Sequence, residues 1–281
     1  MITITTDFGS PYPAAMKGVL CQRTDARLVD VAHDLPRQDV RAGAFWLREV
    51  LPYFPPATHL VVVDPGVGTD RDAIVIRAGE HLLVGPDNGV LQPVARRLAD
   101  GPDRQAYVVD ESGLESVEPT GISETPRASL GGDAGESTDR NPDAPASNTF
   151  HGRDVFAPVA AAVHDVGPDD LESLSWLSRT ADVVDCELPT ATITDDRAEG
   201  EVLVVDDFGN VITNVPGSVL EGRSIVDANG EPVPVGETFA AVPVGERLAT
   251  VGSHGHVELD VNQGRGDEAF GLEAGDRVEL E

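Results

Sequence analysis

The spacing of apolar residues changes along the chain, and this change limits the folds that are possible. Up to about residue 115, short apolar runs alternate with amphipathic stretches whose apolar residues recur at helical spacing. This alternation predicts an α/β domain in which helices cover a mostly parallel sheet. Beyond about residue 186 the runs are short and alternating, with Gly, Asp, Asn and Pro between them. They predict a smaller all-β, barrel-like domain. We therefore expect two domains, 1–185 and 186–281.

The spacing of apolar residues also predicts where individual strands and helices lie. In the N-terminal domain we expect strands at Ile2–Thr6, Ala26–Val31, His59–Val63, Ala73–Ile76, His81–Val84 and Ala106–Val109, and helices at Pro13–Arg23, Val40–Leu51, Asn88–Leu98 and Arg153–Val166. In the C-terminal domain we expect strands at Glu201–Val205, Val211–Val215 and Val257–Val261.

A polar segment, Glu118–Asn148, separates the last expected N-terminal strand from the last expected N-terminal helix. It consists of Gly, Ser, Thr, Pro, Asp and Glu with hardly an apolar residue, so burial cannot offset its ordering entropy. We expect a long exposed loop. Two interpretations are open: a lid over a nearby site, or an acidic insertion that only solvates the surface.

The charge balance excludes some classes of partner. The chain has 49 acidic and 20 basic residues, a formal net charge of -29, and Lys17 as its single lysine. Such a surface repels nucleic acid and anionic membranes. It is typical of a protein that stays hydrated in concentrated salt, which points to a halophilic host, and it also suits a cationic ligand.

Cysteine usage and hydropathy exclude further classes. Cys21 and Cys186 are too few and too far apart for a disulfide framework or a metal-ligand cluster, so we expect reduced thiols, no metal and no cofactor. The N-terminus has no basic region followed by a long apolar run, and no later segment reaches membrane-spanning length. These features favour a cytoplasmic protein that has no membrane partner.

Several polar motifs follow expected strands, at the edge where open α/β folds bind ligands. Asp7 follows the first strand, the glycine-rich segment from Asp64 to Arg71 follows another, and His151 precedes a helix. A carboxylate can accept ribose hydroxyls, and a histidine can exchange protons near neutral pH. Taken singly, the glycine-rich segment is equally consistent with a plain turn, and Asp7 and His151 are more often turn, cap or surface residues. The same holds for Asp206-Asp207-Phe208-Gly209-Asn210 and Ser253-His254-Gly255 in the C-terminal domain.

Taken together and in this order, the motifs resemble the S-adenosyl-L-methionine (SAM) hydroxide adenosyltransferases, relatives of the SAM-dependent chlorinases and fluorinases. The resemblance covers nearly the whole chain apart from the polar segment. It rests on Thr5-Thr6-Asp7-Phe8-Gly9, Met16-Lys17-Gly18-Val19, Val63-Asp64-Pro65-Gly66-Val67-Gly68-Thr69, Gly85-Pro86-Asp87-Asn88-Gly89 and Phe208-Gly209-Asn210.

The resemblance implies both a fold and a set of binding residues. The fold is an N-terminal α/β domain followed by a β-barrel domain, in a homotrimer that binds its ligand between neighbouring subunits. The implied substrate contacts are Asp7 to the ribose hydroxyls, Asp206 to the methionine ammonium, Ser253 to the carboxylate, Asn210 to the adenine, and Phe208 and Phe239 as apolar walls.

The resemblance also implies which nucleophile attacks. Asp64, Arg71 and His151 stand where the hydrolytic branch has its water-activating residues, whereas the halogenating branch has tyrosines in place of Asp64 and His151. Gly152 stands where fluorinases have a halide-contacting serine. A carboxylate beside the reacting carbon repels a halide and accepts a hydrogen bond from water. We therefore expect hydrolysis of SAM at ribose C5′ to adenosine and L-methionine. The alternatives are a SAM-dependent halogenase and a noncatalytic protein that binds SAM or adenosine.

Overall fold

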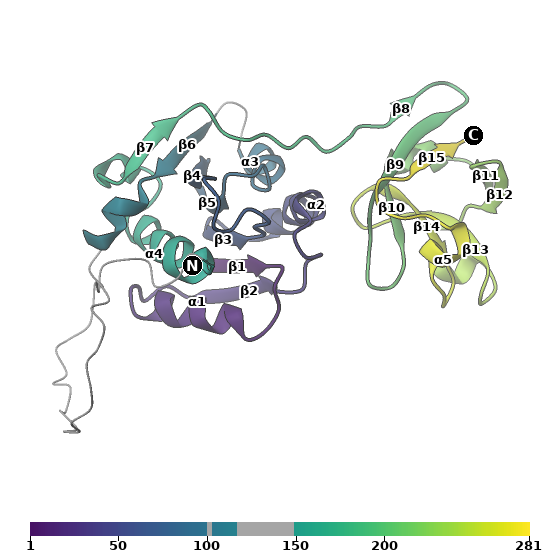
Figure 1. The fold of residues 1–281 in the computed structure, drawn as a ribbon. Helices are drawn as coiled ribbons and strands as arrows, with labels where there is room; N and C mark the ends of the chain where they lie inside the picture. The colour runs from purple at the N-terminus through teal and green to yellow at the C-terminus, as the bar shows by residue number, and fades with distance from the viewer. Residues whose placement is uncertain (100–102, 117–148) are drawn as a thin grey trace, which may run out of the picture. The chain divides into compact units, whose positions relative to one another are not determined.

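The structure is a computed structural model that describes residues 1–99, 103–116 and 149–281. The chain divides into two compact units, Met1–Cys186 and Glu187–Glu281, which are described separately (Figure 1). The polar segment Glu118–Asn148, with the choice between lid and insertion, lies outside the described residues.

The N-terminal unit is built on a seven-stranded sheet of order β2-β1-β3-β5-β4-β6-β7. The first four strands pair in parallel and the others antiparallel, so the sheet is mixed and the predicted α/β class is confirmed. β4 and β5 pair antiparallel because two residues, Gly79 and Glu80, join them in a hairpin. The strands are β1 (Ile2–Thr6), β2 (Leu28–Ala32), β3 (Thr58–Val62), β4 (Ala73–Ala78), β5 (His81–Pro86), β6 (Arg104–Val109) and β7 (Leu177–Thr180).

Helices cover both faces of this sheet, which explains why β3 is buried at every position. Leu60 and Val62 belong to the core under α1 and α4, whereas Val61 and Val63 belong to the core under α2 and α3. The helices are α1 (Tyr12–Cys21), α2 (Val40–Val50), α3 (Gln92–Leu98) and α4 (Ala157–Val166), with shorter turns η1 (Leu51–Tyr53), η2 (Glu111–Ser116), the π-helical η3 (Gly152–Phe156) and η4 (Leu171–Ser173).

The helix predicted from Asn88 begins later, at Gln92. The Asn88 side chain donates to the Val63 carbonyl at 2.9 Å and accepts from the Val90 amide at 3.1 Å. These bonds hold the chain in a turn at the end of β5, and the helix starts after it.

The C-terminal unit is a nearly closed antiparallel sheet of order β12-β11-β15-β9-β10-β14-β13, with β8 paired to β9, and the predicted barrel-like class is confirmed. An isolated bridge between Val235 and Ala249 joins the two ends of the sheet. Its elements are β8 (Thr192–Ile193), β9 (Ala198–Val205), β10 (Val211–Pro216), η5 (Gly217–Leu220), β11 (Ile225–Ala228), β12 (Glu231–Pro234), η6 (Phe239–Ala241), β13 (Arg247–Val251), β14 (His256–Val261), α5 (Gly266–Phe270) and β15 (Arg277–Leu280).

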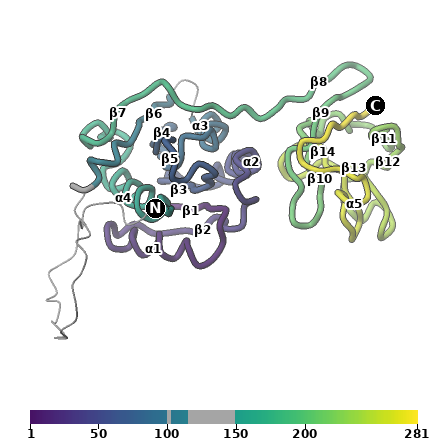
Figure 2. Tube along the Cα trace, viewed as in Figure 1, coloured from purple at the N-terminus to yellow at the C-terminus, as the bar shows by residue number. Residues whose placement is uncertain are grey.

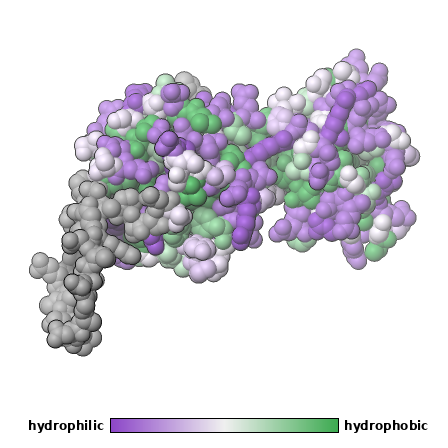
Figure 3. All heavy atoms as spheres, in the orientation of Figure 1, coloured by the Kyte–Doolittle hydropathy of each residue, from purple (hydrophilic) through white to green (hydrophobic). Residues whose placement is uncertain are grey.

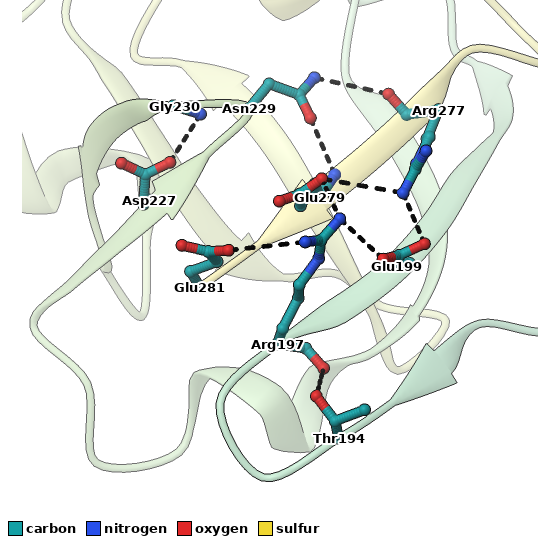
Figure 4. A network of polar contacts seen from close by, with 9 residues as sticks. All are labelled: Thr194, Arg197, Glu199, Asp227, Asn229, Gly230, Arg277, Glu279 and Glu281. Carbon is teal, nitrogen blue, oxygen red and sulfur yellow. Dashed lines mark hydrogen bonds and ion pairs between the residues drawn. The ribbon is translucent and has the colours of Figure 1, made fainter.

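An arginine–carboxylate network holds β15 against β9 (Figure 4). Arg197 bonds Glu199 at 2.7 Å and also pairs with Glu279, while Arg277 reaches Glu199 at 2.6 Å. A planar guanidinium can contact several carboxylates at once, which suits a chain whose positive charge is almost entirely arginine.

Hydrophilic residues dominate the visible surface of both units (Figure 3). Between β7 and β8 the chain runs without regular secondary structure (Figure 2). Among the described residues, no helix combines the length and the apolar character that crossing a membrane requires.

Two buried histidines lie in the N-terminal sheet, on β3 and β5. His59 is 0% exposed, and its ring nitrogens contact Thr3 Oγ1 at 2.7 Å and His81 Nδ1 at 2.9 Å. Burial, together with repulsion from His81, lowers the pKa of His59 to about 3. The pair is therefore neutral in the folded protein at neutral pH.

We predict that this pair makes the fold sensitive to acid. His59 has a lower pKa folded than unfolded, so its stabilising contribution is full above about pH 6.5 and is lost as the pH falls toward 3. The loss amounts to about 5 kcal/mol of unfolding free energy at the acid end. Denaturant unfolding between pH 7 and 4 should give a flatter pH profile for His59→Gln than for the wild type. Parallel profiles would contradict the prediction.

Candidate functional site

The register of β1 and β3 places two carboxylates side by side. Thr6 pairs with Val62 in these parallel strands, so Asp7 and Asp64 leave the sheet at the same carboxyl edge. Asp7 is 6% exposed and accepts a 2.6 Å hydrogen bond from the Gln38 amide. Burial raises the pKa of Asp7, and repulsion from Asp64 at the neighbouring strand end raises it further.

The loop after Asp64 turns the chain back so that Arg71 meets it. Gly68 has a φ of 79°, a left-handed conformation that glycine adopts without a steric penalty. Arg71 Nε donates to Asp64 Oδ1 at 2.9 Å, and its Nη2 donates to Oδ2. The side chains of Asp64 and Arg71 are 5% and 10% exposed. The result is a largely buried two-point ion pair with a fixed orientation.

His151 joins this pair from the start of η3. Arg71 Nη2 donates to His151 Nδ1 at 3.0 Å. Because a guanidinium can only donate, Nδ1 is the unprotonated nitrogen, and the neutral ring has its proton on Nε2. The Arg71 guanidinium also lies over the Phe156 ring, 4.9 Å from its centroid. His151 directly precedes the π-helix and Phe156 is its last residue, and this form of helix is often found at functional sites.

Aromatic rings surround the same edge of the sheet. Phe8, Tyr12 and Phe150 contact one another edge to face, with centroids 5.5 to 6.1 Å apart. Tyr12 is 55% exposed. These rings give the polar cluster an apolar neighbour, a combination typical of small-molecule sites.

In the C-terminal unit, Asp206 and Asn210 form a rigid turn between β9 and β10. Asp206 Oδ1 accepts from the amides of Phe208 and Asn210, both at 2.9 Å, and Oδ2 accepts from Asn210 Nδ2 at 3.0 Å. Gly209 has a φ of 89°, and a Cβ there would lie 2.8 Å from the Cβ of Arg265, so the turn requires glycine. The turn projects Phe208 outward, 79% exposed.

The other two candidates of this unit are also at its surface. Ser253 is exposed in the turn between β13 and β14, and Phe239 is 43% exposed on η6. Exposed aromatic rings such as Phe208 and Phe239 are costly in water and suit stacking on a planar ligand.

The structure thus brings four predicted residues together in the N-terminal unit and two in the C-terminal unit. Asp7, Asp64, Arg71 and His151 share one sheet edge, and Asp206 is bonded to Asn210. Among the residues described, no group of three or more His, Cys, Asp or Glu side chains is arranged to hold a metal ion.

Three residues of interest were missed by the sequence reasoning. Phe156 was predicted only as an apolar position of a helix, yet its ring makes a cation–π contact with Arg71. Glu258 and Asp260 lie on β14. Burial, with repulsion from Asp206, raises the pKa of Glu258 to about 7, and burial, with repulsion from Glu258 and Asp206, raises that of Asp260 to about 8. The alternation Val257, Glu258, Leu259, Asp260, Val261 contained a signal, since it puts both acids on one face of the strand.

The Asp64–Arg71–His151 cluster can orient a small polar molecule. Arg71 neutralises Asp64, whose oxygens retain lone pairs for a further hydrogen bond, and His151 Nε2 can donate one. Such a fixed pairing of acceptor and donor suits a water molecule, which can donate to the carboxylate and accept from the ring.

Comparison with known proteins matches both units to one family. Residues 2–172 match the SAM hydroxide adenosyltransferase N-terminal domain, and residues 200–279 match the C-terminal domain of the same family. The chain is 39% identical to an (R)-S-adenosyl-L-methionine hydrolase of Salinispora tropica, over 99% of this chain and 97% of that protein. It is 40% identical to the protein of that name from Thermus thermophilus, over 98% and 97%.

A solved structure is similar to this chain over its full length. The crystal structure of an uncharacterized conserved protein from Thermotoga maritima matches with a TM-score of 0.78 and 29% identity, covering 100% of this chain and 99% of that one. Family domains that span most of the chain and relatives close to 40% identical over nearly full length leave one assignment: the protein belongs to the SAM hydroxide adenosyltransferase family.

Proposed function

We propose that this protein hydrolyses S-adenosyl-L-methionine at ribose C5′, releasing adenosine and L-methionine. The observation on which this proposal depends is the connected cluster of Asp64, Arg71 and His151 beside Asp7. Relatives named as SAM hydrolases support the same reaction. A halogenase would need room for an anion where the chain has the Asp64 carboxylate, so water is the nucleophile that fits the charges.

The proposed chemistry is an in-line displacement. The water oxygen forms a bond to C5′ while the C5′–S bond breaks, and the bonding pair leaves with sulfur as a neutral thioether. The methionine side therefore needs no general acid. The attacking oxygen becomes strongly acidic as its bond to carbon forms, so its proton can pass late to a modest base. Fixing the nucleophile in line provides much of the rate.

The cluster divides this work among its side chains. His151 Nδ1 already accepts from Arg71, and its Nε2 has the proton, so the neutral ring acts as a hydrogen-bond donor to the water. Asp64 is the acceptor, and Arg71 holds both groups in place. We therefore assign the proton-accepting role to Asp64.

The substrate contacts in this proposal follow the family resemblance. Asp7 binds the ribose hydroxyls, Asn210 the adenine, Asp206 the ammonium and Ser253 the carboxylate of the methionine part, with Phe208 and Phe239 as apolar walls. The exposure of Phe208 and the rigid Asp206–Asn210 turn support these roles. We also propose a homotrimer with sites between subunits, and a cytoplasmic enzyme of a halophilic host, in line with the net charge of -29.

Labelled water tests the reaction itself. We predict that turnover of SAM in ¹⁸O-water yields adenosine with the label on its 5′ oxygen, and L-methionine without it. Because the relatives are named for the R epimer at sulfur, both sulfonium epimers should be supplied separately. Mass spectrometry of the separated products is the measurement, with chloride present in one arm. Chlorinated adenosine, or adenosine without label, would refute hydrolysis.

Substitutions test the water-activating cluster. We predict that Arg71→Ala and His151→Ala each lower kcat by about 10²- to 10⁴-fold and change the SAM affinity by no more than a few fold. The double substitution should cost less than the product of the single effects, since both groups act on one water. His164→Ala, on α4 and outside the cluster, is the control. If the double substitution instead lowers kcat by the full product of the single effects, Arg71 and His151 act independently and do not share one water.

Mass measurement tests the assembly. We predict a trimer by sedimentation in molar salt, where the acidic surface is screened. Mixing an Asp64→Asn subunit with an Asp206→Ala subunit should restore part of the activity, because some shared sites then contain neither substitution. A fully active monomer would exclude the shared-site arrangement.

A further inference from the structure

Three carboxylates of the C-terminal unit stand in one row across neighbouring strands. The Asp206 amide donates to the Asn210 carbonyl at 3.2 Å across the β9–β10 turn. The pairing of Val211 with Leu259 then puts Asn210 beside Asp260 on β14. Glu258 lies two residues before Asp260, so it points to the same face. Asp206, Glu258 and Asp260, the acidic row, thus share one surface of the sheet.

The buried acids of the row, Glu258 and Asp260, have no positive charge opposite them on the neighbouring strands. Asp260 is 0% exposed, and neither of its carboxylate oxygens has a hydrogen-bond partner among the described residues. Across the strands, Glu258 stands opposite Ile212 and Thr250, and Asp260 opposite Leu248, none of which is charged. Burying an acid without a partner destabilises a fold, and such groups are usually retained for a ligand or for chemistry.

Arg265, a cation near Asp206, already makes its hydrogen bonds to other groups. Asp206 attracts Arg265 electrostatically. The Arg265 guanidinium, however, donates its hydrogen bonds to both oxygens of Asp267, at 3.0 and 2.7 Å, and to the Asp207 carbonyl. Glu268 on α5 adds another negative charge beside Arg265. The acidic row therefore presents net negative charge to whatever binds next to Asp206.

The row also connects the two ends of the proposed amino-acid site. A Cβ on Gly252 would lie 1.7 Å from Glu258 Oε1, so the Glu258 carboxylate reaches beneath the turn that bears Ser253. At the other end of the row, the negative charge of Asp206 raises the pKa of Glu258. Glu258 therefore lies between the residues assigned to the ammonium and to the carboxylate of the substrate.

We infer that Glu258 and Asp260 are positioning residues that reinforce Asp206, so that the acidic row recognises an organic α-ammonium group. The inference rests on the proposed function, which supplies a ligand with such a group. An ammonium at Asp206 stabilises the ionised forms of the acids behind it, and by linkage those ionised forms tighten binding of the ammonium.

This recognition makes binding depend on pH. Burial, first, and repulsion by the other acids raise the pKa of Glu258 to about 7 and that of Asp260 to about 8. As the pH rises from 5.5 to 7.5 Glu258 ionises, so affinity for an ammonium ligand rises with it. Other titratable or charged groups near Glu258 are Asp206 and His256, which lies two residues before Glu258 on the same face of β14. Arg265 and the acids Asp267 and Glu268 of α5 lie beyond Asp206.

The test measures binding without turnover. Calorimetry would use S-adenosyl-L-homocysteine, which keeps the ammonium but has a neutral sulfur, and its counterpart lacking the amino group. We expect Glu258→Gln to weaken S-adenosyl-L-homocysteine about tenfold at pH 7.5 and less than about twofold at pH 5.5, where Glu258 is already protonated. Its effect on the counterpart should stay below about twofold. Wild-type binding near pH 7 should release protons to the buffer, and the variant should release fewer.

Two further variants keep the inference falsifiable. Asp260→Asn should weaken the same ligand selectively while leaving the melting temperature equal or higher, since it removes a buried ionisable group. Glu199→Gln, on β9 within the arginine network, removes the same charge away from the row and should leave affinity unchanged. Equal losses for both ligands, or unchanged affinity in Glu258→Gln and Asp260→Asn, would overturn the inference. Adenosine release from SAM by the wild type, measured in parallel, tests the proposed function separately.

Discussion

The two hydrogen bonds between the Arg71 guanidinium and the Asp64 carboxylate are the interaction on which the N-terminal site depends. They place a positive charge directly against a nearly buried carboxylate, and the same guanidinium fixes which nitrogen of His151 is protonated. Remove the arginine, and Asp64 would be an uncompensated buried charge close to Asp7. Lysine could not replace it, because one ammonium cannot make this forked contact and also lie flat over Phe156.

The surrounding fold supplies the rigidity that this geometry needs. Two apolar cores hold β3 from both sides, so the chain leaves the sheet at Asp64 in a fixed direction. On the opposite side of the site, His151 and Phe156 are set by the π-helix that leads into α4. Side chains on such supported elements keep their orientation without help from a ligand, and this preorganisation is what a water-activating site requires.

The C-terminal unit balances stability against binding in a different way. Its core and the Arg197 network hold the barrel together, whereas Glu258 and Asp260 bury acid groups that lack a cation. The arginine network joins β9 to β15, whereas the two buried acids lie on β14, so the stabilised part of the barrel can compensate for the costly one. Sites that bind charged ligands commonly retain such locally unfavourable groups.

The sequence by itself determined the class of both units and most of the candidate site. Strand and helix periodicities located β1, β3, β9, β10 and α2 to within a residue or a few, because those segments are long enough to show a period. The four-residue strands β7, β11, β12 and β15 were missed because they are too short to show a period, and β12 also contains two prolines. The motif order indicated the family and named Asp64, Arg71 and His151.

Only the tertiary structure decided that Arg71 bonds both partners, that Phe156 supports it, and that Asp260 stands beside Asn210. These contacts depend on strand register and on chain reversal between distant segments, which no local pattern encodes.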